Sequence, residues 1–128
     1  MNIRIEHVAI WVRDIDRVAE FYARYFGARV GDLYRNERKG FESRFLEFAT
    51  GARLEIMRRV DVTEGSAAER LGFAHIAITV GSEADVDAFA ARIAADGMNV
   101  AGAPRRTGDG YYECVVLDPE GNRVEVTA

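Results

Sequence analysis

Two histidines and two glutamates at matching positions are the residues of this chain with the clearest capacity for chemistry. The only histidines are His7 and His75, and each precedes a Val/Ile-Ala-Ile segment. Glu55 and Glu125 both follow an Arg and an aliphatic residue. Imidazole and carboxylate groups without a thiolate are a ligand set for Zn, Ni, Co, Mn or Fe. We therefore expect one divalent metal ion bound by His7, Glu55, His75 and Glu125.

The surrounding sequence is an internal repeat. Residues 5–10 (IEHVAI) reappear as residues 73–78 (FAHIAI), and residues 51–56 reappear as residues 121–126. After each histidine comes a stretch with apolar residues at the helical spacing i, i+3, i+4, i+7. These residues are Val18, Phe21, Tyr22 and Tyr25 in the first half and Val86, Phe89, Ala90 and Ile93 in the second.

The signals that start and end helices match in the two halves. Asp14 and Ser82 hold equivalent repeat positions and are expected helix N-caps, and Ser82 forms a capping box with Asp85. Gly27 and Gly97 are expected to end the helices, since glycine readily adopts the left-handed conformation found there. Because these glycines lie 70 positions apart, whereas the histidines lie 68 apart, the second helix should be slightly longer.

Each half therefore has the order strand, helix, strand, strand, strand. We predict an α+β fold of two tandem βαβββ modules within one domain that spans residues 1–128. The first module covers residues 1–60, the second covers residues 73–128, and the polar stretch 61–72 links them.

Alternation along the strands places the four candidate ligands opposite the helices. Neighbouring side chains of a strand point to opposite faces of its sheet. Val8 and Ile10 should therefore face the helix, while His7 lies on the other face, and the same rule applies to Glu55, His75 and Glu125. We expect two curved half-barrel sheets around a metal cleft, with the helices on the outer faces.

The composition excludes several classes of protein. Hydrophobic residues make up 48% of the chain and charged residues 30%, which is typical of a globular protein. A net charge of −4 and a pI near 5.2 provide no basic surface for nucleic acid. The sequence contains no long apolar run and no signal-peptide pattern, so we expect a cytoplasmic protein without a membrane segment. The single cysteine, Cys114, should be a buried thiol.

Four segments carry a family resemblance that extends over the whole chain. They are HVAI at residues 7–10, EFYARYFG at 20–27, GFAHIA at 72–77 and DPEGNRVE at 118–125. These segments resemble the vicinal oxygen chelate superfamily, which includes glyoxalase I, methylmalonyl-CoA epimerase, thiol transferases, extradiol dioxygenases and bleomycin-binding proteins. The order His, Glu, His, Glu is similar to the ligand set of bacterial glyoxalase I. The resemblance implies a metal cleft built within one chain or across a homodimer.

The function implied by this resemblance is that of a metal-dependent lyase or isomerase acting on a small carbonyl or hydroxy-carbonyl substrate. The metal would act as a Lewis acid. Glu125, with Glu55 as its symmetry mate, is the expected catalytic residue that transfers a proton. Glutathione-dependent members carry Arg and Asn where this chain has Trp11 and Arg59, so we do not expect a standard glutathione clamp.

Candidate substrate-binding residues are Trp11, Arg59, Arg105 and Arg106. Trp11 either lines the cleft for an apolar or aromatic substrate or is a packing residue. Arg105 and Arg106 are expected in a loop before the third strand of the second half. They either bind an anionic substrate or are solvated charges.

Two other classes of function remain open. One is a metal-dependent dioxygenase or thiol transferase of the same superfamily, which would need redox-active iron or a thiol and an electrophile. The other is a binding protein of the bleomycin-resistance type that sequesters an apolar drug without a metal. The metal content of the purified protein would separate these alternatives.

Overall fold

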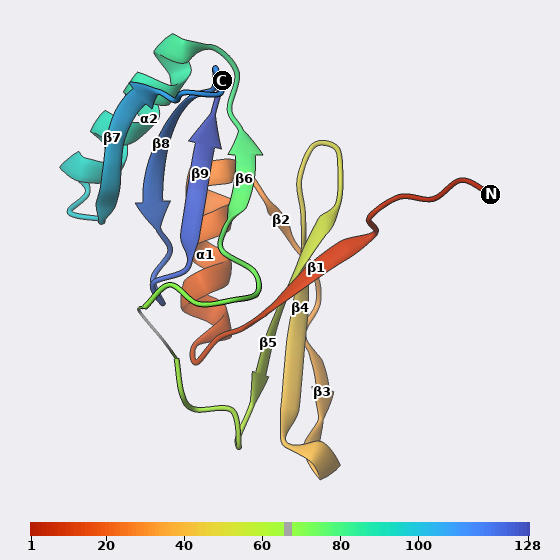
Figure 1. Ribbon diagram of the computed structural model, residues 1–128. Helices are drawn as coiled ribbons and strands as arrows, with labels where there is room; N and C mark the ends of the chain where they lie inside the picture. The colour runs from red at the N-terminus through yellow and green to blue at the C-terminus, as the bar shows by residue number, and fades with distance from the viewer. Residues whose placement is uncertain (66–67) are drawn as a thin grey trace. The chain divides into compact units, whose positions relative to one another are not determined.

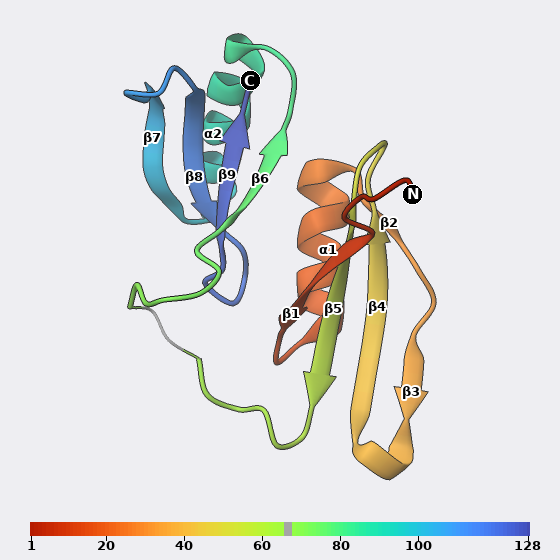
Figure 2. The same ribbon diagram turned by 45° about the vertical axis from the view of Figure 1, so that its right-hand side comes forward.

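The computed structural model describes residues 1–65 and 68–128 (Figures 1 and 2). The chain divides into two compact units, whose bounds are Met1–Gly65 and Ser66–Ala128. Each unit has one long helix packed against one face of a mixed sheet. The predicted linker, residues 61–72, contains no helix or strand among its described residues, and residues 66–67 lie outside the described part of the chain. Neither long helix in the described ranges has the length and apolar character needed to cross a membrane.

The first unit consists of β1 (His7–Trp11), α1 (Ile15–Phe26), β2 (Arg29–Val30), β3 (Tyr34–Asn36), the short 3₁₀ helix η1 (Glu37–Lys39), β4 (Phe41–Glu47) and β5 (Arg53–Arg59). The strand order in its sheet is β1-β5-β4-β2, and β3 also pairs with β4. β1 runs parallel to β5, whereas β4 runs antiparallel to β5. The first and last strands of this unit are therefore neighbours in the sheet.

The second unit consists of β6 (Ile76–Thr79), α2 (Glu83–Ala95), β7 (Val100–Arg106), β8 (Tyr112–Leu117) and β9 (Arg123–Thr127). Its sheet has the order β6-β9-β8-β7, with β6 parallel to β9. The first and last strands are again neighbours. The predicted α+β class and the βαβββ order are confirmed in this unit.

The first unit departs from the predicted order because its second strand is interrupted. β2 and β3 both pair with β4, but three residues separate Val30 from Tyr34, whereas two separate their partners Leu46 and Ser43. This extra residue is a β-bulge. The amide of Gly31 donates a 2.8 Å hydrogen bond to the Phe45 carbonyl, and a Cβ at this glycine would lie 3.0 Å from the same oxygen.

Both helices begin at the predicted caps. The Asp14 side chain accepts a hydrogen bond from the amide of Arg17, and Ser82 forms the expected capping box with Asp85. Gly27 (φ 64°) caps α1 in the left-handed conformation, and Gly97 (φ 74°) follows α2 by two residues in the same conformation. The second helix has 13 residues and the first has 12, as the offset between the glycines predicted.

The apolar faces of the helices and sheets form the core of each unit. The fully buried side chains include Val18, Tyr22, Leu46 and Ile56 in the first unit and Val86, Ile93, Val116, Val124 and Val126 in the second. All eight helical residues predicted from the i, i+3, i+4, i+7 spacing are buried. Cys114 is also buried, and burial raises the pKa of its thiol to about 11.

Truncation of this core should destabilise the protein measurably. Ile56 has no exposed surface, so Ile56→Ala is expected to lower the free energy of unfolding by about 2–5 kcal/mol through lost burial and cavity formation. Val60 is 63% exposed, and Val60→Ala should change the free energy by less than about 0.5 kcal/mol. Equilibrium unfolding in urea measures both. Equal effects of the two substitutions would contradict this account of the core.

Candidate metal centre

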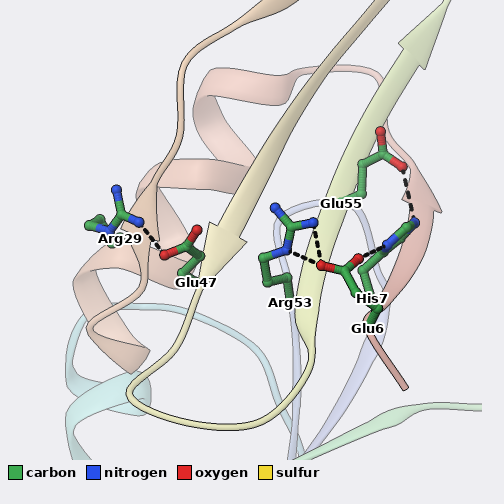
Figure 3. A network of polar contacts seen from close by, with 6 residues as sticks. All are labelled: Glu6, His7, Arg29, Glu47, Arg53 and Glu55. Atoms are coloured by element: carbon green, nitrogen blue, oxygen red, sulfur yellow. Dashed lines mark hydrogen bonds and ion pairs between the residues drawn. The ribbon is translucent and has the colours of Figure 1, made fainter. Parts of the chain in front are cut away.

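The face of each sheet that lies opposite its helix is here called the non-helix face. In the first unit this face carries a histidine and a glutamate side by side. Glu55 lies between the buried Leu54 and Ile56 and points away from the helix. Nε2 of His7 lies 3.8 Å from Oε1 of Glu55 (Figure 3). The side chain of His7 is 39% exposed and that of Glu55 is 16% exposed. The predicted alternation therefore brings these two candidate ligands together.

The other nitrogen of the His7 ring is engaged by Glu6, a residue that the sequence analysis did not single out. Nδ1 of His7 contacts Oε2 of Glu6, and the other carboxylate oxygen, Oε1, accepts hydrogen bonds from Nε (2.8 Å) and Nη2 of Arg53 (Figure 3). The hydrogen bond with His7, followed by the contacts with Arg53, lowers the pKa of Glu6 below its usual value of 4.5. Glu6 is therefore ionised at neutral pH and can only accept a hydrogen bond from the imidazole.

Phe45 of β4 contacts both partners of Glu6. The ring of His7 meets the Phe45 ring edge-on, with centroids 5.2 Å apart, and the Arg53 guanidinium lies 4.0 Å from the Phe45 centroid. Phe45 is the cross-strand partner of Glu55, so it shares the non-helix face. It supports the group formed by Glu6, His7, Arg53 and Glu55 from the adjacent strand.

The second unit repeats the pairing of histidine with glutamate. Nε2 of His75 lies 3.1 Å from Oε2 of Glu125, and these side chains are 40% and 23% exposed. Glu125 lies between the buried Val124 and Val126. His75 immediately precedes β6, rather than lying within it as expected from the repeat, while His7 is the first residue of β1. Strand ends vary by one or two residues, and the pairing is unaffected.

Glu113 is a further carboxylate beside Glu125 that the sequence analysis missed. It faces Thr127 across the β8–β9 ladder and is only 8% exposed. Burial, followed by the charge of Glu125 and a hydrogen bond with it, raises the pKa of Glu113 above 4.5. Its burial could have been predicted from the sequence, because Glu113 lies within the mostly apolar strand YECVVL of β8.

This raised pKa predicts a pH-dependent stability of the metal-free protein. The pKa of Glu113 is higher in the folded protein than in the unfolded chain. The free energy of unfolding therefore falls as pH rises from the unfolded pKa through the folded pKa. Glu113→Gln should therefore raise the free energy of unfolding at neutral pH and change it little below pH 4.5. Urea titrations at both pH values measure the difference. A Gln variant less stable at neutral pH would contradict the expected sign.

The chemistry of both pairs, and the spacing of the second pair, fit metal ligation. Donor atoms about 2.1 Å from one ion are about 3.0 Å apart at a right angle and about 3.4 Å apart at a tetrahedral angle. The His75–Glu125 separation of 3.1 Å lies in this range, and the His7–Glu55 separation of 3.8 Å is slightly longer. Within the described ranges, 1–65 and 68–128, no group of three or more His, Cys, Asp or Glu side chains forms a metal site by itself.

In the first unit, aromatic side chains cluster around Trp11, at the end of β1 opposite His7. Trp11 is 40% exposed and contacts Phe41 edge-on, with centroids 6.2 Å apart. Phe41 in turn contacts Tyr34, with centroids 6.1 Å apart. The guanidinium of Arg59 lies 5.0 Å from the centroid of Trp11 and is paired with Asp61. Two of the predicted substrate-binding residues, Trp11 and Arg59, are thus in contact.

The expected loop position of Arg105 and Arg106 was wrong, because both residues lie in strand β7. Arg105 is the cross-strand partner of Glu113, which shares the face of Glu125. Arg106 has the opposite orientation, since it forms an ion pair with Glu83 of α2. The structure therefore separates these two arginines onto different faces of their sheet.

The misread segment contains glycine and proline, which usually indicate a loop. β7 is an edge strand, and its ladder with β8 has register shifts between Val100 and Gly102 and between Gly102 and Arg105. An edge strand with bulges tolerates both residue types, because one side of it makes no ladder hydrogen bonds. A Cβ at Gly102 would make a tight contact, 3.3 Å, with the side chain of Val115.

In each unit the first and last strands are paired, and the non-helix face carries a histidine and a glutamate. Comparison with known proteins identifies the family of this chain. The family model described as the Glyoxalase/Bleomycin resistance protein/Dioxygenase superfamily matches residues 4–126. The chain belongs to this superfamily. The resemblance identified from the sequence is thereby confirmed. No curated protein sequence matches the chain.

Solved structures of this superfamily share the fold. Glyoxalase I from Zea mays is 23% identical with a TM-score of 0.80, and the match covers 97% of this chain and 44% of the maize chain. The trypanothione-dependent glyoxalase I of Leishmania major is 23% identical with a TM-score of 0.79, covering 98% and 86% of the two chains. A glyoxylase/bleomycin resistance protein/dioxygenase domain from Frankia sp. is 17% identical with a TM-score of 0.80, covering 99% and 98%. This chain thus spans less than half the length of the maize protein.

Proposed function

We propose that this superfamily member is a metal-dependent lyase or isomerase of the glyoxalase I type that acts on a small carbonyl or hydroxy-carbonyl substrate. One divalent ion, Zn, Ni, Co, Mn or Fe, would be held by His7, Glu55, His75 and Glu125. The observation that supports this proposal is the repeated pairing of an imidazole Nε2 with a glutamate carboxylate on the non-helix face of each sheet. Both pairs offer an imidazole nitrogen and a carboxylate oxygen as donors, without a thiolate.

Within this proposal, the glutamates move the proton. When bound, the ion would supply Lewis-acid polarisation of a substrate carbonyl. The carboxylate of Glu125, with Glu55 as its counterpart in the first repeat, accepts a proton from the carbon next to that carbonyl and returns it to the neighbouring carbon. The two side chains are partly exposed, at 23% and 16%, so a substrate can approach them.

The proposed substrate is apolar or aromatic and carries a negative charge. Trp11 offers an exposed indole face, and Arg59 beside it provides a guanidinium. Arg105 is a second candidate for the anionic group because it lies on the same face as Glu113. Arg106, the fourth residue predicted from the sequence, is paired with α2 through Glu83, and this placement favours a structural role for it.

Metal content and a substrate panel test the proposal together. We expect protein purified without added metal to contain a divalent ion by mass spectrometry, and to isomerise an α-ketoaldehyde thiol adduct or a related hydroxy-ketone. Assembly as a homodimer in the cytoplasm is part of the proposal, and sedimentation tests the assembly. The absence of any tightly bound divalent ion after dialysis against each candidate metal would refute the proposal.

A second candidate, sequestration of an apolar drug, is favoured by one observation. Trp11 and Tyr34 are 40% and 56% exposed and are joined through Phe41, which is a surface suited to stacking on a flat ligand. Tight binding of an aromatic drug by metal-free protein would favour this function. Oxygen consumption with a catechol and bound iron would instead favour a dioxygenase, and transfer of a thiol to an epoxide would favour a thiol transferase.

A further inference from the structure

We propose that Glu6, clamped by Arg53, is a positioning residue that fixes the His7 ring so that Nε2 is the metal-binding nitrogen. This inference rests on the proposed metal site and deepens it. In this proposal Glu6 acts only through His7, which its carboxylate contacts. The close-up in Figure 3 shows the carboxylate of Glu6 between the guanidinium of Arg53 and the imidazole of His7.

The position of the proton on the His7 imidazole depends on its neighbours. A neutral imidazole has one N–H, and the tautomer is set by the partner that accepts it. The Glu6 carboxylate is the hydrogen-bond partner of Nδ1, whereas Glu55 lies 3.8 Å from Nε2, which is too far for a hydrogen bond. The proton therefore lies on Nδ1, and the lone pair of Nε2 is directed towards Glu55.

The orientation of the His7 ring is held from two sides. Glu6 is itself held by two nitrogens of Arg53, the residue directly opposite His7 in the β1–β5 ladder. The guanidinium of Arg53 stacks 4.0 Å from the centroid of Phe45, and the Phe45 ring also makes a T-shaped contact with His7. The imidazole is thus fixed at Nδ1 by Glu6 and at its side by Phe45. A ring fixed before metal binding loses less rotational freedom when it binds.

The repeat offers an internal comparison. His75 is preceded by Ala74, so the second unit has no carboxylate at the position of Glu6, although Arg123 corresponds to Arg53 in the sequence repeat. His7 lies opposite Arg53 in the β1–β5 ladder, whereas the β6–β9 ladder begins one residue after His75, at the pair Ile76 and Val124. The positioning carboxylate is therefore a property of the first histidine only. The two histidines are expected to bind metal unequally.

Metal titration of the purified apoprotein tests the proposal without measuring activity. Outer-shell partners of ligating histidines typically contribute about 10- to 100-fold to metal affinity. Glu6→Ala is expected to weaken Zn²⁺ binding by about this factor in calorimetry, and Glu6→Gln, which keeps an acceptor oxygen, should recover part of it. Glu37→Ala, which removes an exposed carboxylate of η1, is the charge-matched control and should bind as the wild type does.

A spectroscopic readout keeps the test independent of the metal and of the proposed function. In ¹⁵N-edited spectra of the apoprotein, His7 should show the Nδ1–H tautomer, and Glu6→Ala should shift it towards Nε2–H. Wild-type protein that binds no metal would refute the proposed function, while the tautomer of His7 would still decide the role of Glu6. The positioning role would be overturned if the wild type and folded Glu6→Ala had the same tautomer populations of His7 and Zn²⁺ affinities within about twofold of each other.

Discussion

Glu125→Gln is expected to lower turnover by about 10²- to 10⁴-fold while the protein remains folded. A glutamine amide cannot accept the proton that the proposed reaction transfers, and positioned acid–base groups contribute an effect of this size. The fold should tolerate the change, because Glu125 lies on the non-helix face, where its charge helps to raise the pKa of Glu113. The measurement is kcat with the best substrate of the panel, accompanied by circular dichroism and metal analysis.

The matched control is Glu20→Gln, which changes an exposed carboxylate of α1 to the same amide. This control should retain full turnover. Glu55→Gln tests the symmetry mate, and a smaller loss there than at Glu125 would assign the proton transfer to the second repeat. Full activity in the Glu125→Gln protein would refute its catalytic role. If the Glu125→Gln protein loses bound metal in proportion to its loss of activity, Glu125 acts only as a metal ligand.

His75→Ala is expected to weaken metal binding by more than about 100-fold and to abolish turnover. A direct ligand should contribute more than an outer-shell partner, for which about 10- to 100-fold is typical. Because the His75 side chain is 40% exposed, its truncation removes little core packing and should leave thermal unfolding of the apoprotein nearly unchanged. Zn²⁺ calorimetry and steady-state kinetics measure the two effects.

Chelation of the wild-type protein provides the comparison for this variant. Dialysis against a strong chelator should remove activity, and addition of one of the candidate metals should restore it in the wild type but not in His75→Ala. Lys39→Ala, which removes an exposed cation of η1, should respond as the wild type does. An active His75→Ala protein with its metal retained would show that this histidine is not a ligand.

The helices and their supporting strands were predictable because their signals are local. The spacing of Val18, Phe21, Tyr22 and Tyr25 defines one buried helical face, and the Asp14 cap begins that helix. Period-two alternation around Glu55 was enough to assign its face. These signals depend on neighbours within a few residues, so the sequence expresses them directly.

The missed features depend on partners that are distant in the sequence. The bulge that separates β2 from β3 lies where Gly31 closely approaches Phe45 on the adjacent strand. The strand conformation of Arg105 and Arg106 depends on pairing with β8, which overrides the local preference of glycine and proline for a loop. Neither cause is visible from the residues next to the affected segment.

The duplicated α+β modules, the buried helix faces and the four candidate ligands could be predicted from the residues, since each follows from periodicity or repetition along the chain. The contacts between side chains emerge only in the folded chain: Glu6 and Arg53 around His7, Glu113 beside Glu125, and Arg106 with α2. Such contacts require the register between strands that are far apart in the sequence. That register is fixed by backbone pairing and core packing, which no single segment encodes.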